Sequence, residues 1–228
     1  MIIKHIRNLF KSRQLATYSC PCYHKSFMPY RELIFDIETQ KLFDDIQSGN
    51  PADLGVSIVS VYKRLVENGK ELSGQMFSFW VQDLSGLWPL FSNVDRIIGF
   101  NSLKFDVPVL APLSPFDLKH LNHFDMLDII KDILGHRLSL DTLATATLGA
   151  GKTDSGLNAV TYWQQSTPES LAKLQHYCEH DVLVTRDLYD YGVVHGHLKY
   201  LDRWNTLRMV DVDFSYPKSD SIPQMGLF

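Results

Sequence analysis

Short apolar runs separated by turn residues occupy the first half of the chain. Residues 32–38, "ELIFDIE", are rich in β-branched and aromatic side chains and predict a buried strand. Residues 55–62, "GVSIVSVY", alternate apolar and polar positions and predict a second strand, and residues 74–81, "GQMFSFWV", predict a third. Asn68-Gly69 supplies a turn between these two strands. Residues 96–100, "RIIGF", predict a fourth.

Helical spacing of apolar side chains becomes common further along the chain. Residues 83–93 predict a helix, and the prolines between residues 108 and 115 allow only short ones, because proline interrupts the helical hydrogen bonds. Ser139, a suitable N-cap, and Gly149, a suitable stop, delimit another helix. The longest predicted helix runs from Pro168 to about Val194.

The order of these elements indicates one α/β domain at residues 31–216, closed by a hairpin within residues 199–214. We find no internal repeat and no strong linker. A basic extension at residues 1–30 precedes the domain, and an irregular tail at residues 217–228 follows it. The expected fold is a mixed central β-sheet flanked by helices.

The composition is that of an ordinary globular protein, with 45% hydrophobic and 21% charged residues in a chain of 228. No apolar run approaches the roughly 18 to 20 residues that span a bilayer, so we expect no membrane partner. The three cysteines are too few for a disulfide framework, which favours a reducing compartment and a cytoplasmic protein of bacterial type.

The net charge of −4 is unevenly distributed. Residues 1–31 hold six basic and no acidic side chains, so the remaining 22 − 6 = 16 basic residues face all 26 acids and leave −10. Apolar residues interleave with the bases near the N-terminus at helical spacing, as in an organellar presequence, and a mitochondrial location is therefore the alternative. The other interpretation is a flexible basic extension that helps to hold nucleic acid.

Two acids follow an apolar run where core residues are expected. Asp36 and Glu38 are i and i+2 on a predicted strand, so both side chains point to the same face. Two carboxylates held together beside apolar residues repel each other and lose hydration unless a cation compensates. Hard cations such as Mg²⁺ or Mn²⁺ prefer such oxygen ligands. The alternative is a strand that ends in a solvated loop.

Further acids follow a strand and lie within the long helix. Asp106 has apolar neighbours and is expected to face a site, to cap a helix starting at Val107, or to do both. Asp125 also follows an apolar residue, but a role as the cap of a helix at residues 126–134 explains it equally well as a place in the site. Tyr177 and Asp181 are i and i+4, on one face of a continuous helix. His176 and Asp181 are i and i+5, about 140° apart around the axis, so His176 would face elsewhere.

Three segments together resemble the exonuclease motifs of the DEDD superfamily of 3′–5′ exonucleases: "FDIET" (35–39), "FNSLKFD" (100–106) and "YCEHD" (177–181). The resemblance covers roughly residues 31–200. It is greatest to the branch of predicted exonucleases related to the proofreading domain of family B DNA polymerases, notably over residues 124–163. It implies a ribonuclease H-like fold and a nucleic-acid 3′ end as substrate, with single-stranded DNA as the expected strand and RNA as the alternative.

The resemblance also implies roles for particular residues. The catalytic acids would be Asp36, Glu38, Asp106 and Asp181, which hold two Mg²⁺ or Mn²⁺ ions, with Tyr177 as the fifth residue of a DEDDy-type site. The ions clamp the attacking and leaving oxygens of a phosphodiester, and the product is a nucleoside 5′-monophosphate. The histidine variant of the family places its His five residues before the last Asp, which here is His176. The helix geometry favours Tyr177.

Substrate contacts are expected from four residues near these motifs, which are Thr39, Asn101, Phe105 and Lys152. Phe35, Phe100 and Phe105 are candidates for stacking on bases. Lys152 lies in "GAGKT", which lacks the first glycine of a phosphate-binding loop. Cys20, Cys22 and His24 are one ligand short of a zinc site. The competing functional hypothesis is a non-catalytic nucleic-acid-binding or partner domain of the same fold.

Overall fold

The computed structural model describes residues 29–149 and 156–216. Several sequence-based predictions therefore lie outside the described residues. They are the basic extension up to residue 28, the candidate ligands Cys20, Cys22 and His24, the substrate contact Lys152, and the tail at residues 217–228.

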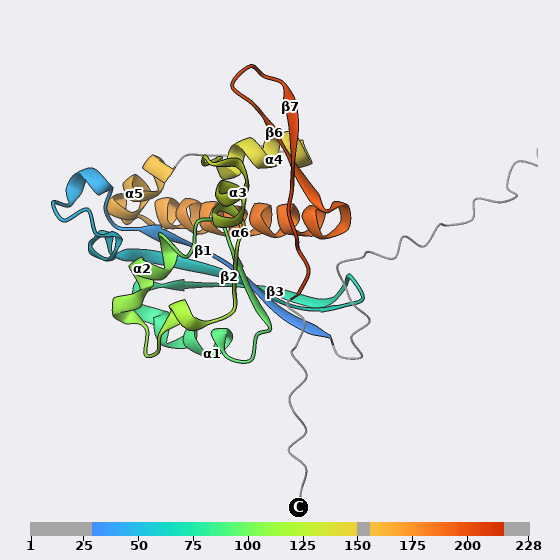
Figure 1. The fold of residues 1–228 in the computed structure, drawn as a ribbon. Coiled ribbons are helices and arrows are strands. Elements are labelled where there is room, and N and C mark those ends of the chain that lie inside the picture. Colours follow the sequence, from blue (N-terminus) through green and yellow to red (C-terminus); the bar gives the residue numbers. More distant parts are fainter. Residues whose placement is uncertain (1–28, 150–155, 217–228) are drawn as a thin grey trace, which may run out of the picture.

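A five-stranded mixed sheet forms the centre of the molecule (Figure 1). Its order is β3-β2-β1-β4-β5, with β1 antiparallel to β2 and parallel to β4. The strands are β1 (Tyr30–Thr39), β2 (Val56–Glu67), β3 (Lys70–Trp80), β4 (Arg96–Gly99) and β5 (His123–Asp125). The four predicted strands are confirmed, and β5 was missed, since three residues carry no periodic signal. Asn68 and Gly69 join β2 to β3 with φ values of 51° and 76°, which a two-residue hairpin turn requires.

The segment after β3 differs from the prediction. A single helix at residues 83–93 is wrong, because a 3-10 helix at Val81–Gly86 is followed by the separate short helix α1 (Trp88–Phe91). Pro89 lacks the amide hydrogen that a continuous helix would use, but it fits the first turn of a new one.

The two sheet faces are covered by different elements, as Figure 1 shows. Short helices lie under one face: α1, α2 (Asp106–Leu110) and 3-10 turns at Phe43–Asp45, Pro51–Leu54, Ala111–Leu113 and Leu118–His120. The other face carries α3 (Met126–Leu134), α4 (Leu140–Leu148), α5 (Gly156–Gln165) and α6 (Pro168–His195). On β1 the odd positions Leu33, Phe35 and Ile37 pack in the core between the sheet and the short helices, whereas Ile34 packs in the core on the other face, with α3, α4 and α6. Alternate side chains of a strand face opposite ways, so one strand supplies both cores.

Helix α6 has the predicted bounds and is continuous. Thr167 caps its N-terminus by accepting a hydrogen bond from the Ser170 amide, Pro168 occupies the first turn, and Gly196 ends the helix with φ 73°. Helix α4 likewise has Ser139 as N-cap and Gly149 as C-cap, as predicted. Helix α5 was missed. None of the helices in the described part of the chain is both long enough and apolar enough to cross a bilayer.

The predicted closing hairpin is confirmed as a two-stranded ribbon, β6 (His197–Leu201) and β7 (Leu207–Asp211). In Figure 1 this ribbon projects from the end of α6 past α4, on the side of the sheet that carries α3 to α6.

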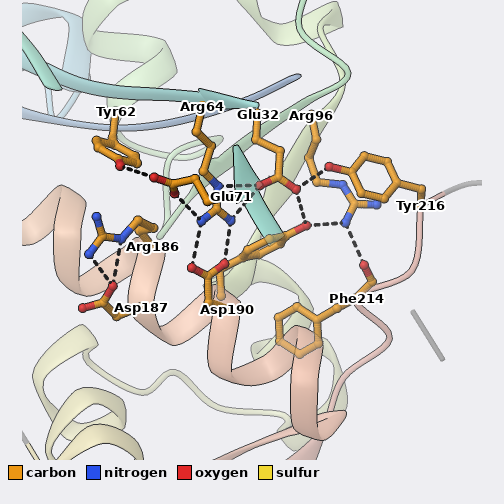
Figure 2. A network of polar contacts seen from close by, with 11 residues as sticks. Glu32, Tyr62, Arg64, Glu71, Arg96, Arg186, Asp187, Asp190, Phe214 and Tyr216 are labelled. Atoms are coloured by element: carbon orange, nitrogen blue, oxygen red, sulfur yellow. Dashed lines mark hydrogen bonds and ion pairs between the residues drawn. The ribbon is translucent and has the colours of Figure 1, made fainter. Parts of the chain in front are cut away.

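A buried polar network joins β1, β2 and β4 to α6 and to the segment after β7 (Figure 2). Glu32 is fully buried and accepts hydrogen bonds from Arg64 at 2.7 Å, from Tyr189 at 3.2 Å and from the Tyr216 hydroxyl. Arg64 also binds Asp190, and Arg96 donates to Tyr189 and to the carbonyl of Phe214, each at 2.8 Å. Because these buried charges satisfy one another, the network fixes α6 on the sheet.

Candidate functional site

The carboxyl-terminal half of β1 extends past its neighbour β4. The parallel pairing covers only Glu32 to Ile34, whereas the antiparallel pairing with β2 continues to Thr39. Asp36 and Glu38 therefore lie where β1 has lost one partner strand, with their half-buried side chains on the same side of the sheet. The predicted pairing of these two acids on one face is confirmed by this register.

Helix α6 presents Tyr177 and Asp181 to the same place. The two residues are one turn apart, both are buried, and both line one cavity together with Asp36 and Glu38. Between them, the Cys178 thiol donates a weak hydrogen bond to the Asp36 carbonyl oxygen at 3.5 Å. Cys178 is fully buried, so it is a packing contact between α6 and β1.

Three carboxylates gather at this point. Each of Asp36, Glu38 and Asp181 has an oxygen within 4.8 Å of an oxygen of the other two. Three like charges at such separation are unfavourable in a partly buried site unless a cation is bound. The donor set consists of carboxylate oxygens, which suits a hard divalent cation better than a thiolate-preferring metal. The residues therefore fit the divalent ions that the sequence resemblance implies.

Asp106 lines the cavity from a third element, the short helix α2. It is the first residue of α2 and Phe105 occupies the N-cap position, so the predicted capping role of Asp106 is wrong. The side chain is buried and lines the cavity. Burial, with the nearby charge of Asp125, raises the pKa of Asp106 to about 7, while backbone hydrogen bonds from Asp106 itself and Ile37 act in the opposite direction. Its oxygens are not part of the three-carboxylate cluster.

The cavity has a volume of about 310 Å³ and is open to solvent. Two predicted substrate contacts, Thr39 and Phe105, line it, and so does Phe100. Phe35 is buried in the core on the other sheet face, so its suggested role in base stacking is wrong. The prediction missed four further lining residues from the segment after β1, which are Lys41, Leu42, Phe43 and Leu54. The only sequence feature that could have indicated Lys41 and Phe43 as lining residues is that they follow the acid pair within five residues.

Asn101 does not line the cavity. Its side-chain oxygen accepts a hydrogen bond from Arg137 at 2.7 Å, and its backbone has φ 67°. Its amide and that of Leu103 donate to the carboxylate of Asp125, at 2.8 and 2.9 Å. Asp125 also caps α3, as one of the two interpretations predicted. The structure thus gives both residues a part in holding the turn before Asp106.

His176 lies away from the cavity. Its side chain is exposed, and its ring stacks on that of His180 with centroids 6.5 Å apart. The continuous helix therefore brings Tyr177, not His176, to the side of Asp181, as the helix geometry predicted.

Comparison with known proteins places this geometry in a family. The sequence model of the RNase H superfamily matches residues 33–193, and the chain belongs to that superfamily. The ribonuclease H-like α/β fold expected from the sequence is thereby confirmed.

Among solved structures, the fold resembles the family B DNA polymerase from the hyperthermophilic archaeon Pyrobaculum calidifontis, with a TM-score of 0.54 and 21% sequence identity. The match covers 72% of this chain and 25% of the polymerase, so the chain spans about a quarter of that protein's length. A search of curated proteins gave no match. The superfamily match supports a nuclease-type protein that acts on nucleic acid, and the likeness to the polymerase shows a shared fold.

Proposed function

We propose that the protein is a metal-dependent 3′–5′ exonuclease of the DEDDy type that shortens single-stranded DNA from its 3′ end. The observation that carries the proposal is the convergence of three carboxylates from β1 and α6 with Asp106 and Tyr177 around one cavity. The superfamily match supports a nuclease, and a two-metal nuclease site needs such a cluster of oxygen ligands.

In this proposal Asp36, Glu38, Asp106 and Asp181 hold two Mg²⁺ or Mn²⁺ ions. Bound ions would supply Lewis acidity to the phosphodiester and would favour ionisation of a water molecule. The carboxylates would act on the negatively charged phosphate only through these cations, because bare carboxylates would repel it. Hydrolysis adds this water across the P–O3′ bond, releases a nucleoside 5′-monophosphate and leaves a new 3′-hydroxyl on the strand.

Tyr177 would orient the attacking water by hydrogen bonding. Tyrosine side chains are poor bases near neutral pH, since their reference pKa is about 10, so the role proposed for this residue is to position the water. Thr39 and Phe105 would contact the terminal nucleotide from the wall of the cavity. Asn101 would act only through the turn that it shares with Asp125.

The competing function is a nucleic-acid-binding domain without catalysis. Within the described residues, all four acids of the expected set and Tyr177 line the cavity, which favours the enzyme.

Residues 31–216 would form the exonuclease domain. The cytoplasmic location and its mitochondrial alternative stay predictions from composition.

The test compares DNA and RNA oligonucleotides labelled at either end, with Mg²⁺ or Mn²⁺. The wild-type protein should release a 3′ label at once as a mononucleotide and convert a 5′ label into a ladder of shorter strands. Asp36→Asn should abolish both, while Asp83→Asn, an exposed acid on the 3-10 helix after β3, should behave as the wild type. Equal shortening by Asp36→Asn, or no shortening with either ion, contradicts the proposal. Faster shortening of RNA than of DNA contradicts the choice of DNA.

A further inference from the structure

The β6-β7 ribbon has an unusual outer face. Its inner side chains, Leu198, Tyr200 and Val210, are buried against the helices. The opposite face carries three cross-strand pairs, Leu201 with Leu207, Lys199 with Met209 and His197 with Asp211. Met209 and Leu207 are 59% and 54% exposed, although polar residues normally occupy the solvent side of such a ribbon. An apolar surface of this kind indicates a ligand.

The tip of the ribbon presents a tryptophan on a well-held loop. Trp204 is 67% exposed, and the guanidinium carbon of Arg203 lies 4.0 Å from the centroid of its ring. The Asp202 carboxylate accepts hydrogen bonds from the amides of Trp204 at 2.9 Å and Thr206 at 3.0 Å, and from Arg208 at 2.9 Å. The loop is thus fixed by its own contacts while the indole faces solvent. Such preorganisation lowers the entropic cost of binding.

The base of the ribbon carries a second aromatic platform. The ring of His195 stacks on Tyr191 with centroids 3.9 Å apart and an interplanar angle of 14°. Lys199 places its amino group 5.6 Å from the centroid of the same tyrosine ring. Lys199 therefore lies between this platform and the apolar middle of the outer face. We call the set Tyr191, His195, Lys199, Met209, Arg203 and Trp204 the ribbon strip.

The charge of the ribbon strip differs from that of the domain. Residues 32–228 have a net charge of −10, by the count given above. Residues 197–211 contain three basic side chains (Lys199, Arg203, Arg208) and two acids (Asp202, Asp211), which gives 3 − 2 = +1. Asp202 is already bound by Arg208, so Lys199 and Arg203 remain beside the two aromatic platforms, with Asp211 as the one remaining acid of the ribbon. Alternating aromatic and basic groups bind single-stranded nucleic acid, because the rings stack on bases and the cations contact phosphates.

We propose that the ribbon strip is a second binding site for single-stranded DNA, which holds the substrate strand some distance upstream of the 3′ end in the cavity. The proposal rests on the proposed exonuclease function for the identity of the ligand. A protein partner would also cover apolar residues, but it would not explain a lysine and an arginine each set over an aromatic ring within an otherwise acidic domain.

The spacing predicts which substrates use this site. Tyr191 follows Asp181 by ten residues on α6, which is about 15 Å along the helix axis. At about 3.4 Å per stacked nucleotide, a strand bound at Asp181 needs roughly four or five nucleotides to reach the base of the strip. The five-residue strands of the ribbon add about 17 Å. A four-nucleotide substrate therefore ends short of the strip, whereas one of about fifteen nucleotides can cover it.

The first test measures kcat/KM on DNA of 4 and of 15 nucleotides. For Trp204→Ala, the ratio of the value on the long substrate to that on the short one should fall at least about fivefold, as expected for one lost base stack. The matched controls are Leu72→Ala and Lys70→Ala, exposed apolar and basic residues of the β2-β3 hairpin, which should keep the wild-type ratio.

The second test measures DNA binding itself by fluorescence anisotropy, with the 15-nucleotide strand and every variant built on Asp36→Asn. The double variant Lys199→Ala/Arg203→Ala should reduce the slope of log affinity against log salt by about 1.4, since each lost phosphate contact on a single strand contributes about 0.7. A merely structural role of the ribbon would not change this slope.

The outcomes separate the two proposals. If the wild-type protein shortens no strand but Trp204→Ala still weakens binding of the long strand, the ribbon strip is supported and the exonuclease function is not. If both substrates are shortened and the ratio and the salt slope stay unchanged, the ribbon strip is overturned while the exonuclease function stands. A change in sedimentation of the free protein with Trp204→Ala, without a change in DNA binding, makes the strip a protein interface and also overturns the proposal.

Discussion

Tyr177 lies one helical turn before Asp181 on α6, and both side chains line the cavity that also holds the acids of β1. The neighbouring His176 is exposed and stacks on His180 instead. A single helix thus determines which of two adjacent polar residues lines the cavity.

The first prediction concerns this pair. Tyr177→Phe should lower kcat on single-stranded DNA by at least about tenfold, since losing one positioning hydrogen bond of about 1.4 kcal/mol corresponds to a factor of ten. His176→Ala should leave kcat within about twofold of the wild-type value, a change of less than about 0.5 kcal/mol. Steady-state kinetics with Mn²⁺ measure both. A severe loss in the histidine variant with a normal tyrosine variant would show that the assignment is wrong.

The second prediction concerns repulsion among the clustered carboxylates. Without metal, Asp36→Asn should raise the free energy of unfolding by about 1 kcal/mol, because one pKa unit of repulsion equals about 1.4 kcal/mol. Adding Mn²⁺ should stabilise the wild-type protein more than the variant, since a ligand stabilises the state that binds it. Calorimetry in EDTA and in Mn²⁺ checks both effects. Asp83→Asn is the control, and a less stable Asp36→Asn in EDTA would contradict a cluster of like charges.

The third prediction concerns Cys178. Burial, with the charges of Asp36 and Glu38, raises the pKa of this thiol well above its ordinary value of about 8.5. The folded protein should keep the thiol protonated and unreactive to iodoacetamide at pH 8.5, and should become less stable as the pH rises above that value, because only the unfolded chain then loses the proton. Mass spectrometry of the peptide carrying Cys178, before and after denaturation, checks the reactivity. Alkylation of the folded protein at the denatured rate would contradict it.

The fourth prediction concerns the contact between α6 and the segment after β7. A Cβ atom added at Gly192 would lie 2.0 Å from the Phe214 ring, which is itself buried against Phe124 and Tyr189. Gly192→Ala should therefore cost about 1–3 kcal/mol by overpacking, despite the better helix propensity of alanine. Chemical denaturation measures the loss.

The double variant Gly192→Ala/Phe214→Ala supplies the control for this contact. Once the ring is removed, the added methyl group should cost nothing further, so the two changes should be strongly non-additive. Additive losses would mean that the Phe214 ring is not the group that excludes a side chain at Gly192.

Local rules were enough for the acid pair and for the long helix. Asp36 and Glu38 share a face because strand side chains alternate, and Tyr177 and Asp181 share one because a helix repeats every 3.6 residues. Ser139 and Gly149 were likewise predictable as helix caps, because a serine side chain accepts a hydrogen bond from the first helical turn and glycine readily adopts the left-handed conformation that ends a helix. The same rules misplaced residues 83–93, where Pro89 divides the segment, and gave no sign of β5, whose three residues gain strand geometry only by pairing with β4.

What the sequence by itself determined is the identity of the local elements and, through them, the direction of Asp36, Glu38, Tyr177 and Asp181 on their own strand and helix. Only the tertiary structure decided that these two elements meet, that Asp106 joins them from α2, and that Asn101 supports a turn while Lys41 and Phe43 line the cavity. The physical reason is that periodicity fixes a side chain relative to its own backbone, whereas distances between elements depend on long-range pairing and core packing.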